Sequence, residues 1–290
     1  MKTLIDYDSP IYAIASAVDG SKWNYKGRQW DLKSVAVAAL EAEGRDPTEL
    51  YQTKDPEPWD KVEKTIVKYT DDMINDLNNP FDMMILVGGG GNFRYDIATI
   101  QPYKGNRSGN ELPYHFNAVK DFVVETYNAK RVYGVEVDDA LGILYEDGDL
   151  IISQDKDLLQ IPGKHYNPNS KKESVVSEVE GLRSFYKQVL TGDASDSIPG
   201  LHGVGNSSSF VKEINKMESE KEMLDLVVRL YKQRFGSYYN LFLLENCRLL
   251  WLLRGYDDEI PLWMITLMDD TSFYTKTKWE DFIFVNSADS

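Results

Sequence analysis

The sequence predicts an α/β fold in which a mainly parallel central sheet is flanked by helices, followed by a helical C-terminal region. Short apolar segments rich in β-branched residues recur between turn residues without alternating, which is typical of strands buried on both faces. Helix-length stretches separate these segments, and this alternation favours parallel strands joined by helices. Beyond about residue 178 the patterns are helical, and several of them end at glycine.

Four segments have the expected strand character: residues 3–6, 83–88, 131–135 and 149–153. Helix-length stretches lie among them, at residues 56–78, 113–127 and 138–146. The polar segment 163–174 has the composition of a loop or linker. We therefore expect an α/β core at residues 1–177, with a helical insertion at about 20–80, and a helical region at residues 178–290.

Composition limits the classes of protein that the chain can belong to. With 290 residues, of which 42% are hydrophobic, the chain can bury a sizeable core. The single cysteine, Cys247, lies in an apolar stretch and is expected to be a buried structural thiol. Neither a signal peptide nor an apolar run of membrane-spanning length is evident, so we expect a cytoplasmic protein that binds no membrane.

The net charge of −15 argues, at face value, against nucleic acid as a partner, because proteins that bind polyanions usually carry a basic surface. That inference assumes that the acids are spread over the surface. If many of them converge on one metal site, bound cations neutralise them locally.

Carboxylates follow the predicted strands and helices at four places. These acids are Asp6 and Asp8; Glu136, Asp138 and Asp139; Asp155 and Asp157; and Asp193 and Asp196. The carboxyl ends of parallel strands share one edge of a sheet, so we expect three of these clusters to converge there. Crowded carboxylates repel one another unless protons or cations intervene, and a set of hard oxygen donors selects Mg²⁺ or Mn²⁺ rather than zinc.

Each cluster by itself also has an ordinary structural explanation. Asp138 and Asp139 are placed to cap a helix, while Asp193 and Asp196 suit turns. Asp155 and Asp157 lack the glycine and the terminal glutamate of a calcium-binding EF-hand loop. It is the four clusters together, in this order on an α/β pattern, that favour a metal site.

Basic and glycine-rich segments accompany the acids. Lys104 and Arg107 lie in the stretch "YKGNR", downstream of Arg94, although a solvated loop is the ordinary explanation for one such lysine. The stretch "GLHGVGNSSS" places Gly200, Gly203 and Gly205 between two expected helices. Glycines allow the backbone to approach a phosphate, and the next helix, which carries Lys212, points free N–H groups towards it. Such a hairpin binds the DNA backbone without reading sequence.

Four consecutive glycines, Gly88–Gly91, follow the second expected strand. They match neither a phosphate-binding P-loop nor a dinucleotide-binding fingerprint, because Asn92, Phe93 and Arg94 come next. A tight turn at a strand end is the simplest explanation, since glycine tolerates all the backbone angles that such a turn uses.

The motifs "YKGNR", "GVEVDDALG", "SQDKDLL" and "GDASDSIPGLHGVG", in this order, resemble those of the flap endonuclease and 5′-3′ exonuclease family. The 5′-nuclease domain of bacterial DNA polymerase I belongs to this family, and the length of the chain is similar to that of the bacteriophage branch. The resemblance covers residues 1 to about 215. It implies a PIN-like nuclease core and a helix-hairpin-helix-like (helix-3-turn-helix) DNA-binding motif in the helical region.

The resemblance also implies roles for particular residues. It implies that two Mg²⁺ or Mn²⁺ ions are bound by Asp6, Glu136, Asp138, Asp139, Asp155, Asp157, Asp193 and Asp196. Lys104 and Arg107 would hold the scissile phosphate. A third set would contact DNA: Arg94, Gly200, Gly203, Gly205 and Lys212, with K⁺ held by carbonyls of the hairpin at 200–205. An arch for the 5′ single strand would cover residues of about 105–128.

The chain departs from the family pattern at Gly88–Gly91, where the family carries an aspartate in the loop after the second strand. The resemblance therefore implies a metal shell that lacks one acid. Three explanations stay open: Asp8 or a water takes its place, or the chain has low activity. On this interpretation, Gly89→Asp is expected to strengthen the dependence on metal or raise the rate.

The implied function is a 5′-3′ exonuclease or flap endonuclease that hydrolyses DNA, or RNA in RNA–DNA hybrids, by two-metal catalysis. The expected substrates carry 5′ ends, nicks or flaps, as in DNA replication, repair or recombination, and the expected state is a monomer. The alternative from another class is a catalytically weakened nuclease-fold protein that binds branched DNA without efficient cleavage. A phosphatase that uses Asp6 and Asp8 is a third possibility, but it leaves the glycine hairpin unexplained.

Overall fold

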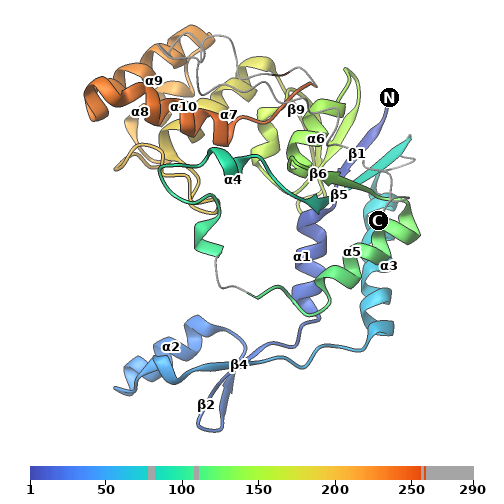
Figure 1. Ribbon diagram of the computed structural model, residues 1–290. Coiled ribbons are helices and arrows are strands. Elements are labelled where there is room, and N and C mark those ends of the chain that lie inside the picture. Colours follow the sequence, from blue (N-terminus) through green and yellow to red (C-terminus); the bar gives the residue numbers. More distant parts are fainter. Residues whose placement is uncertain (78–81, 108–110, 256–257, 259–290) are drawn as a thin grey trace. The chain divides into compact units, whose positions relative to one another are not determined.

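The computed structural model describes residues 1–77, 82–107, 111–255 and 258 (Figure 1). The chain divides into two compact units. The first contains residues 1–7, 80–110 and 129–290, and the second contains residues 8–79 and 111–128. Expectations about residues 78–81, 108–110, 256–257 and 259–290 lie outside the described residues.

A six-stranded sheet with the order β6-β5-β1-β7-β8-β9 forms the centre of the first unit. Its strands are β1 (Thr3–Asp6), β5 (Met83–Gly90), β6 (Lys130–Tyr133), β7 (Leu150–Ile152), β8 (Gly163–Asn167) and β9 (Lys172–Val176). Every neighbouring pair is parallel except β8 and β9. The middle strand β1 is buried throughout, which explains its continuous apolar run. The predicted parallel sheet and its four strands are confirmed.

The segment 163–174 is not the predicted loop. Instead, β8 pairs with β7 in parallel and with β9 in antiparallel register, with His165 opposite Ser174. Strand β9 lies at the edge of the sheet and exposes most of its side chains, so its sequence lacks the apolar signal of a strand.

Helices of the first unit follow the sheet strands or form the C-terminal region. They are α4 (Arg94–Ile97), α6 (Val137–Leu144), α7 (Glu178–Thr191), α8 (Ser209–Ile214), α9 (Glu220–Phe235) and α10 (Tyr239–Leu250). Short 3₁₀ helices are η2 (Gly105–Arg107), η3 (Asp157–Gln160) and η4 (Gly236–Tyr238). Ser177 and Ser219 begin α7 and α9 with capping boxes that satisfy free N–H groups of the first turn. The predicted helical region is confirmed as far as residue 250.

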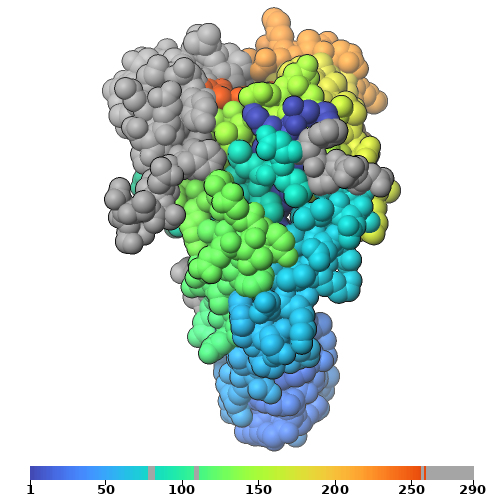
Figure 2. All heavy atoms as spheres, turned by 90° about the vertical axis from the view of Figure 1, so that its right-hand side faces the viewer, coloured from blue at the N-terminus to red at the C-terminus, as the bar shows by residue number. Residues whose placement is uncertain are grey.

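The described part of the second unit combines four α-helices and one short 3₁₀ helix with a small sheet. Its elements are α1 (Asp8–Ala17), β2 (Lys22–Tyr25), β3 (Arg28–Trp30), α2 (Lys33–Ala42), η1 (Pro47–Glu49), β4 (Tyr51–Thr53), α3 (Trp59–Asp76) and α5 (Phe116–Tyr127). Helices α3 and α5 lie side by side, as both Figure 1 and Figure 2 show.

The helical insertion predicted at about 20–80 contains α2 and α3, but its first half also forms an antiparallel sheet with the order β3-β2-β4, which was not predicted. Tyr25 pairs with Arg28, so that Lys26 and Gly27 form a two-residue loop. Their φ angles of 45° and 86° are both positive, as the favoured hairpin turns require. Bulky aromatic residues next to such a turn are typical of strands, and this was the missed signal.

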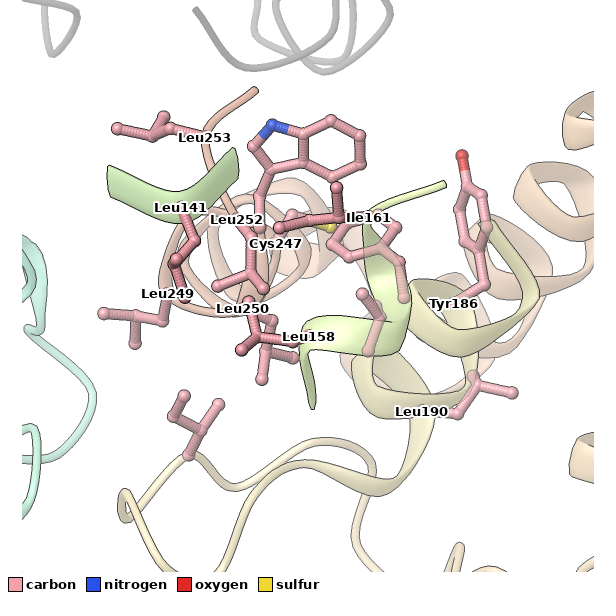
Figure 3. Close-up of a cluster of buried hydrophobic side chains, with 14 of the residues drawn as sticks. Leu141, Leu158, Ile161, Tyr186, Leu190, Cys247, Leu249, Leu250, Leu252 and Leu253 are labelled. Carbon is pink, nitrogen blue, oxygen red and sulfur yellow. The ribbon is translucent and has the colours of Figure 1, made fainter. Parts of the chain in front are cut away.

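The main hydrophobic core joins the sheet to the C-terminal helices. Leu249, Leu250 and Leu252, at and beyond the end of α10, lie among side chains of α6, η3 and α7 (Figure 3). Cys247 is fully buried in this cluster, and burial raises the pKa of its thiol well above the usual range. The prediction of a structural thiol is confirmed. Among the described residues, no helix has the length and apolar character needed to cross a membrane.

Candidate functional site

The site begins where β1 and β7 end, at the carboxyl edge of the parallel sheet. Asp6 is the last residue of β1, and Ser153 directly follows β7. The Ser153 hydroxyl donates to Asp6 Oδ2 over 2.8 Å and accepts the N–H of Asp155 over 2.9 Å. Ser153 thus orients two acids from neighbouring strands. Ser153 was not among the predicted site residues, although it lies only two residues before Asp155.

Asp138 brings a third strand connection to the same edge, because it lies in the first turn of α6, the helix after β6. Burial raises the pKa of the Asp138 carboxyl well above its ordinary value, and the charges of Asp6 and Asp155 raise it further. The expected convergence of acids at one edge of the sheet is therefore observed.

Asp157 extends this group from the first residue of η3. Its N–H donates to Asp155 Oδ1 over 2.8 Å. Burial and the neighbouring charges of Asp155 and Asp193 raise the pKa of Asp157 to about 7. The aspartate from the fourth sequence cluster therefore lies beside those of the third.

Two glycines close the loop that carries Asp193 and Asp196. Gly192 and Gly200 have φ angles of 69° and 57°, and a Cβ at Gly200 would lie 2.2 Å from Gly192 N. Gly200 is buried, so the predicted DNA contact at this residue is wrong: its backbone closes the loop instead. Gly203 and Gly205 are exposed, as is Lys212 on α8, and their predicted DNA contacts stay predictions.

The segment 101–107 holds the loop of Asp193 and Asp196 in place. Lys104 N–H donates to the Asp196 carbonyl over 2.8 Å, and Asn106 Nδ2 donates to the Ala194 carbonyl over 2.8 Å. Arg107 Nη2 lies 2.6 Å from Asp196 Oδ1. The "YKGNR" stretch and the loop that carries Asp193 and Asp196 are therefore one structural unit.

Tyr103 and Lys104 connect this unit to the N-terminus of α6. The Tyr103 hydroxyl lies 3.0 Å from Glu136 Oε2 and 2.7 Å from Asp196 Oδ2. Because a phenol has one proton, it can donate to only one of these carboxylates at a time. Lys104 Nζ forms an ion pair with Glu136 and lies 3.8 Å from Asp196 Oδ2. Tyr103 was not among the predicted site residues, although it directly precedes Lys104.

The pKa values of Glu136 and Asp196 are shifted in opposite directions. Burial alone would raise the pKa of Glu136, but the positive charges of Arg94 and Lys104 lower it below its ordinary value. For Asp196, burial outweighs the opposing charge of Lys104 and the pKa is raised. Positive charge at this place therefore favours an ionised Glu136.

Arg94 and Asp139 are placed differently from the prediction. Arg94 is only 1% exposed, so the predicted DNA contact is wrong. Its guanidinium forms a forked pair with both Asp139 oxygens, and it also donates to backbone carbonyls at the end of α10. Asp139 accepts the N–H of Glu136 over 3.2 Å, in the manner of a helix cap. Asp139 therefore has the helix-capping role that was the alternative explanation for this residue.

The four glycines shape the end of β5. The pairing of β5 with β6 is irregular between Gly88 and Gly90, and the φ angles of Gly90 and Gly91 are 118° and 75°. Gly91 also approaches Gly134, whose N–H donates to the Gly90 carbonyl over 3.2 Å. These are backbone requirements, as the simple turn explanation predicts. Asp8, one of the substitutes considered for the missing acid, is the first residue of α1, and α1 belongs to the second unit.

We expect Gly89→Asp to destabilise the protein, because a Cβ at Gly89 would lie 2.5 Å from the Tyr133 ring. Overpacking of this kind costs about 1–3 kcal/mol of unfolding free energy. Thermal denaturation should show a lower melting temperature for Gly89→Asp, with recovery when Tyr133→Ala is added. An unchanged melting temperature in the single variant would show that the ring moves aside freely.

The acids at the sheet edge have the donor chemistry of a divalent-cation site. Within residues 1–77, 82–107, 111–255 and 258, no group of three or more His, Cys, Asp or Glu side chains is arranged to hold a metal ion. The chemistry of the donors nevertheless fits one: the carboxylates are hard oxygen ligands, and the raised pKa values of Asp138 and Asp157 reflect both burial and mutual repulsion, which a cation relieves.

In a chelating buffer, the raised pKa of Asp157 should make stability depend on pH. The folded carboxyl titrates at about 7 and the unfolded one at about 3.9. The protonated folded form therefore contributes stability that is lost between these two pH values, at most about 4 kcal/mol. We expect Asp157→Asn to gain in melting temperature relative to the unsubstituted protein over this range. If the melting temperatures of the two proteins changed in parallel with pH, the pKa of Asp157 would not be raised. Saturating Mn²⁺ should remove the gain in melting temperature of Asp157→Asn.

The fold defines a class of protein: an α/β chain with a mainly parallel sheet, flanking helices and a C-terminal helical region, with acids at the carboxyl edge of the sheet. No family model matches the chain. Among solved structures, a bacteriophage T5 flap endonuclease in a pseudo-enzyme-product complex with DNA and metal ions is 12% identical, with a TM-score of 0.47, covering 86% of this chain and 99% of that chain. A likeness this partial adds no argument about function.

Three curated relatives are similar to the chain over part of their length. A 5′-3′ exonuclease of Mycoplasmopsis pulmonis is 26% identical over 207 residues, covering 62% of this chain and 67% of that protein. A 5′-3′ exonuclease of Bacillus subtilis is 27% identical over 170 residues, covering 51% and 56%. DNA polymerase I of Chloroflexus aurantiacus is 27% identical over 173 residues, covering 49% and 18%. The chain thus spans about a fifth to two thirds of the length of these relatives, and its similarity to them confirms the predicted resemblance to the 5′-3′ exonuclease and flap endonuclease family.

Proposed function

We propose that the chain is a metal-dependent 5′-3′ exonuclease or flap endonuclease that hydrolyses phosphodiester bonds of DNA. The observation that carries this proposal is the convergence of Asp6, Asp138 and Asp155 from three strand ends, with a raised pKa for the Asp138 carboxyl. A partly buried group of like charges is costly to a fold, and such groups cluster at functional sites. The matched exonucleases and the DNA polymerase give the substrate class.

Two Mg²⁺ or Mn²⁺ ions would be held by the acids of the sheet edge and of the adjacent loop. These acids are Asp6, Glu136, Asp138, Asp155, Asp157, Asp193 and Asp196. When bound, such ions supply Lewis-acid stabilisation of the phosphate and make water nucleophilic at neutral pH.

The basic residues of the "YKGNR" loop would orient the substrate. Lys104 and Arg107 both carry positive charge beside Asp196, where they can hold the scissile phosphate and stabilise the charge that develops on it. Glu136 forms an ion pair with Lys104, so this carboxylate would fix the position of the Lys104 ammonium group. The product strand would carry a 5′-phosphate.

The DNA would be held by exposed groups beyond the acids. Gly203, Gly205 and Lys212, which are exposed, would contact the backbone of a duplex, with K⁺ at the hairpin, and the arch at about 105–128 would accept a 5′ single strand. Nucleotides must unpair to reach buried acids, which favours ends, nicks and flaps, including those of RNA–DNA hybrids. We propose a monomer that acts in the cytoplasm during replication, repair or recombination.

A two-stage binding experiment separates this function from the alternative of DNA binding without cleavage. In a gel shift with a 5′-flap duplex and Ca²⁺, the protein should form a complex that is converted to shorter products when Mg²⁺ is added. A complex that persists unchanged in Mg²⁺ or Mn²⁺ would support the binding protein. The matched exonucleases favour the enzyme.

A further inference from the structure

The carboxylate of Asp139 is fully used by hydrogen bonds within the protein. Its Oδ2 accepts from Arg94 Nη1 and from the Glu136 N–H, and its Oδ1 accepts from Arg94 Nη2 over 2.9 Å and from the Leu253 N–H over 3.1 Å. A carboxylate offers about four lone-pair sites, so these four donors occupy them all. The side chain is also fully buried. This environment differs from that of Asp138, one residue earlier, whose neighbours are other acids.

Residues 249–253, which we call the C-terminal strap, surround this pair with backbone groups. Arg94 Nε donates to the Leu249 carbonyl and Arg94 Nη2 to the Trp251 carbonyl, each over 2.8 Å. The carbonyl of Leu250 accepts from Gln160 Nε2 over 2.9 Å. Every side chain of the strap is buried, and Figure 3 shows its leucines grouped with side chains of α6 and η3. The strap is thus fixed from both its polar backbone and its apolar side chains.

The strap also runs directly against α6, the helix that presents Glu136 and Asp138. A Cβ at Gly142, in the middle of α6, would lie 2.2 Å from the Leu253 carbonyl oxygen. Glycine disfavours a helix, so its presence here is explained by this close approach rather than by helix formation. The same Leu253 donates its N–H to Asp139.

We propose that Arg94, Asp139 and the C-terminal strap form a positioning unit that fixes the N-terminus of α6, and with it the carboxylates of Glu136 and Asp138. The proposal rests on the proposed function, in which those two carboxylates hold metal. Asp139 acts through the Glu136 backbone rather than as a ligand, and Arg94 acts through Asp139 rather than on DNA. Metal binding therefore depends on residues about 110 positions further along the chain.

Gly142→Ala tests this dependence, because it adds one methyl group against the strap while leaving every carboxylate unchanged. Groups that orient metal ligands typically change metal affinity or activity by about 10–100-fold. We expect a loss of at least about tenfold in Mn²⁺ affinity, measured by titration calorimetry of the DNA-free protein. In flap cleavage, kcat should fall while KM for DNA stays the same.

Gly255→Ala is the matched control. It is the same substitution two residues beyond the strap, and a Cβ there would meet no heavy atom of the described residues within 4 Å. It should match the unsubstituted protein in Mn²⁺ affinity and kcat. If Gly142→Ala and Gly255→Ala bind Mn²⁺ equally, the positioning role is wrong.

Hydrogen exchange supplies a readout that needs no activity. The Leu253 and Glu136 amides should exchange faster in Gly142→Ala than in Gly255→Ala, because both are bonded to Asp139. Faster exchange with unchanged Mn²⁺ affinity would overturn the proposal. Should Gly142→Ala fail to fold, Arg94→Lys replaces it: the charge is kept, but one ammonium cannot reproduce the fork, and the same loss of Mn²⁺ affinity is expected.

The outcome can be separated from that of the proposed function. If the unsubstituted protein cleaves no DNA in Mg²⁺ or Mn²⁺, the nuclease proposal fails. The Mn²⁺ titration and the amide exchange still decide whether the strap positions the acids.

Discussion

Replacing Asp155 and Asp157 together by asparagine is expected to abolish flap cleavage while leaving the protein folded. Changing groups that merely orient metal ligands costs about 10–100-fold, so the loss of two proposed ligands should exceed about 100-fold in kcat. Asparagine keeps an oxygen at the place where Asp155 accepts the Asp157 N–H, so the loop should be preserved. Because burial and neighbouring acids raise the pKa of Asp157, neutralising it also removes repulsion.

The measurement has two parts, a single-turnover rate and a melting temperature in a chelating buffer. The double variant should be inactive and at least as stable as the unsubstituted protein. A large loss of stability would mean that these carboxylates serve the fold. Retention of the rate would remove them from the reaction.

Lys104→Ala is expected to slow cleavage strongly with little change in DNA affinity. Removing one group that stabilises developing charge typically costs about 10²–10³-fold in kcat. In the structure Lys104 contacts Glu136 and Asp196, so its loss also leaves Glu136 with less positive charge nearby. The DNA dissociation constant, measured in Ca²⁺, should stay close to that of the unsubstituted protein.

Lys212→Ala provides the control for the Lys104 experiment, since Lys212 is exposed on α8. A phosphate contact at Lys212 predicts weaker DNA binding, a salt dependence reduced by about one unit of slope, and an unchanged single-turnover rate. If Lys104→Ala shows this pattern instead, Lys104 serves binding and not the reaction.

The parallel sheet could be predicted because its middle strand β1 is buried throughout, β7 is mostly buried, and both sequences are mainly apolar. The β8–β9 hairpin could not, because the edge strand exposes most of its side chains and its composition is that of a loop. The small β3-β2-β4 sheet was missed for a related reason: strand β4 is fully exposed and no apolar run marks it. Strands can be recognised in this sequence where their side chains are buried, because burial requires apolar residues. Backbone hydrogen bonding alone requires no particular residues.

The acids of the site could be predicted from their places at strand ends, but the division of work between Asp138 and Asp139 could not. Neighbouring residues of a helix point in different directions, and the sequence does not say which one faces the other acids. In the structure Asp139 accepts hydrogen bonds from Arg94, and no local sequence pattern predicts that Arg94 is buried. Ser153 and Tyr103 were missed because they act through hydrogen bonds to acids from distant parts of the sequence.

The four glycines illustrate the same limit. Their departure from the family pattern suggested a missing metal ligand, whereas the structure gives them a backbone role beside Tyr133 and Gly134. Both statements hold together: the loop carries no acid, and an acid at Gly89 would first have to displace an aromatic ring.

Metal-dependent cleavage of a 5′-labelled flap duplex tests the central claim most directly. The unsubstituted protein and the Asp155→Asn, Asp157→Asn double variant are incubated with the duplex in Mg²⁺, in Mn²⁺ and in a chelating buffer. The account predicts products with a 5′-phosphate only for the unsubstituted protein, and only when a divalent cation is present. Cleavage that persists in the chelating buffer, or that does not exceed that of the double variant, would contradict it.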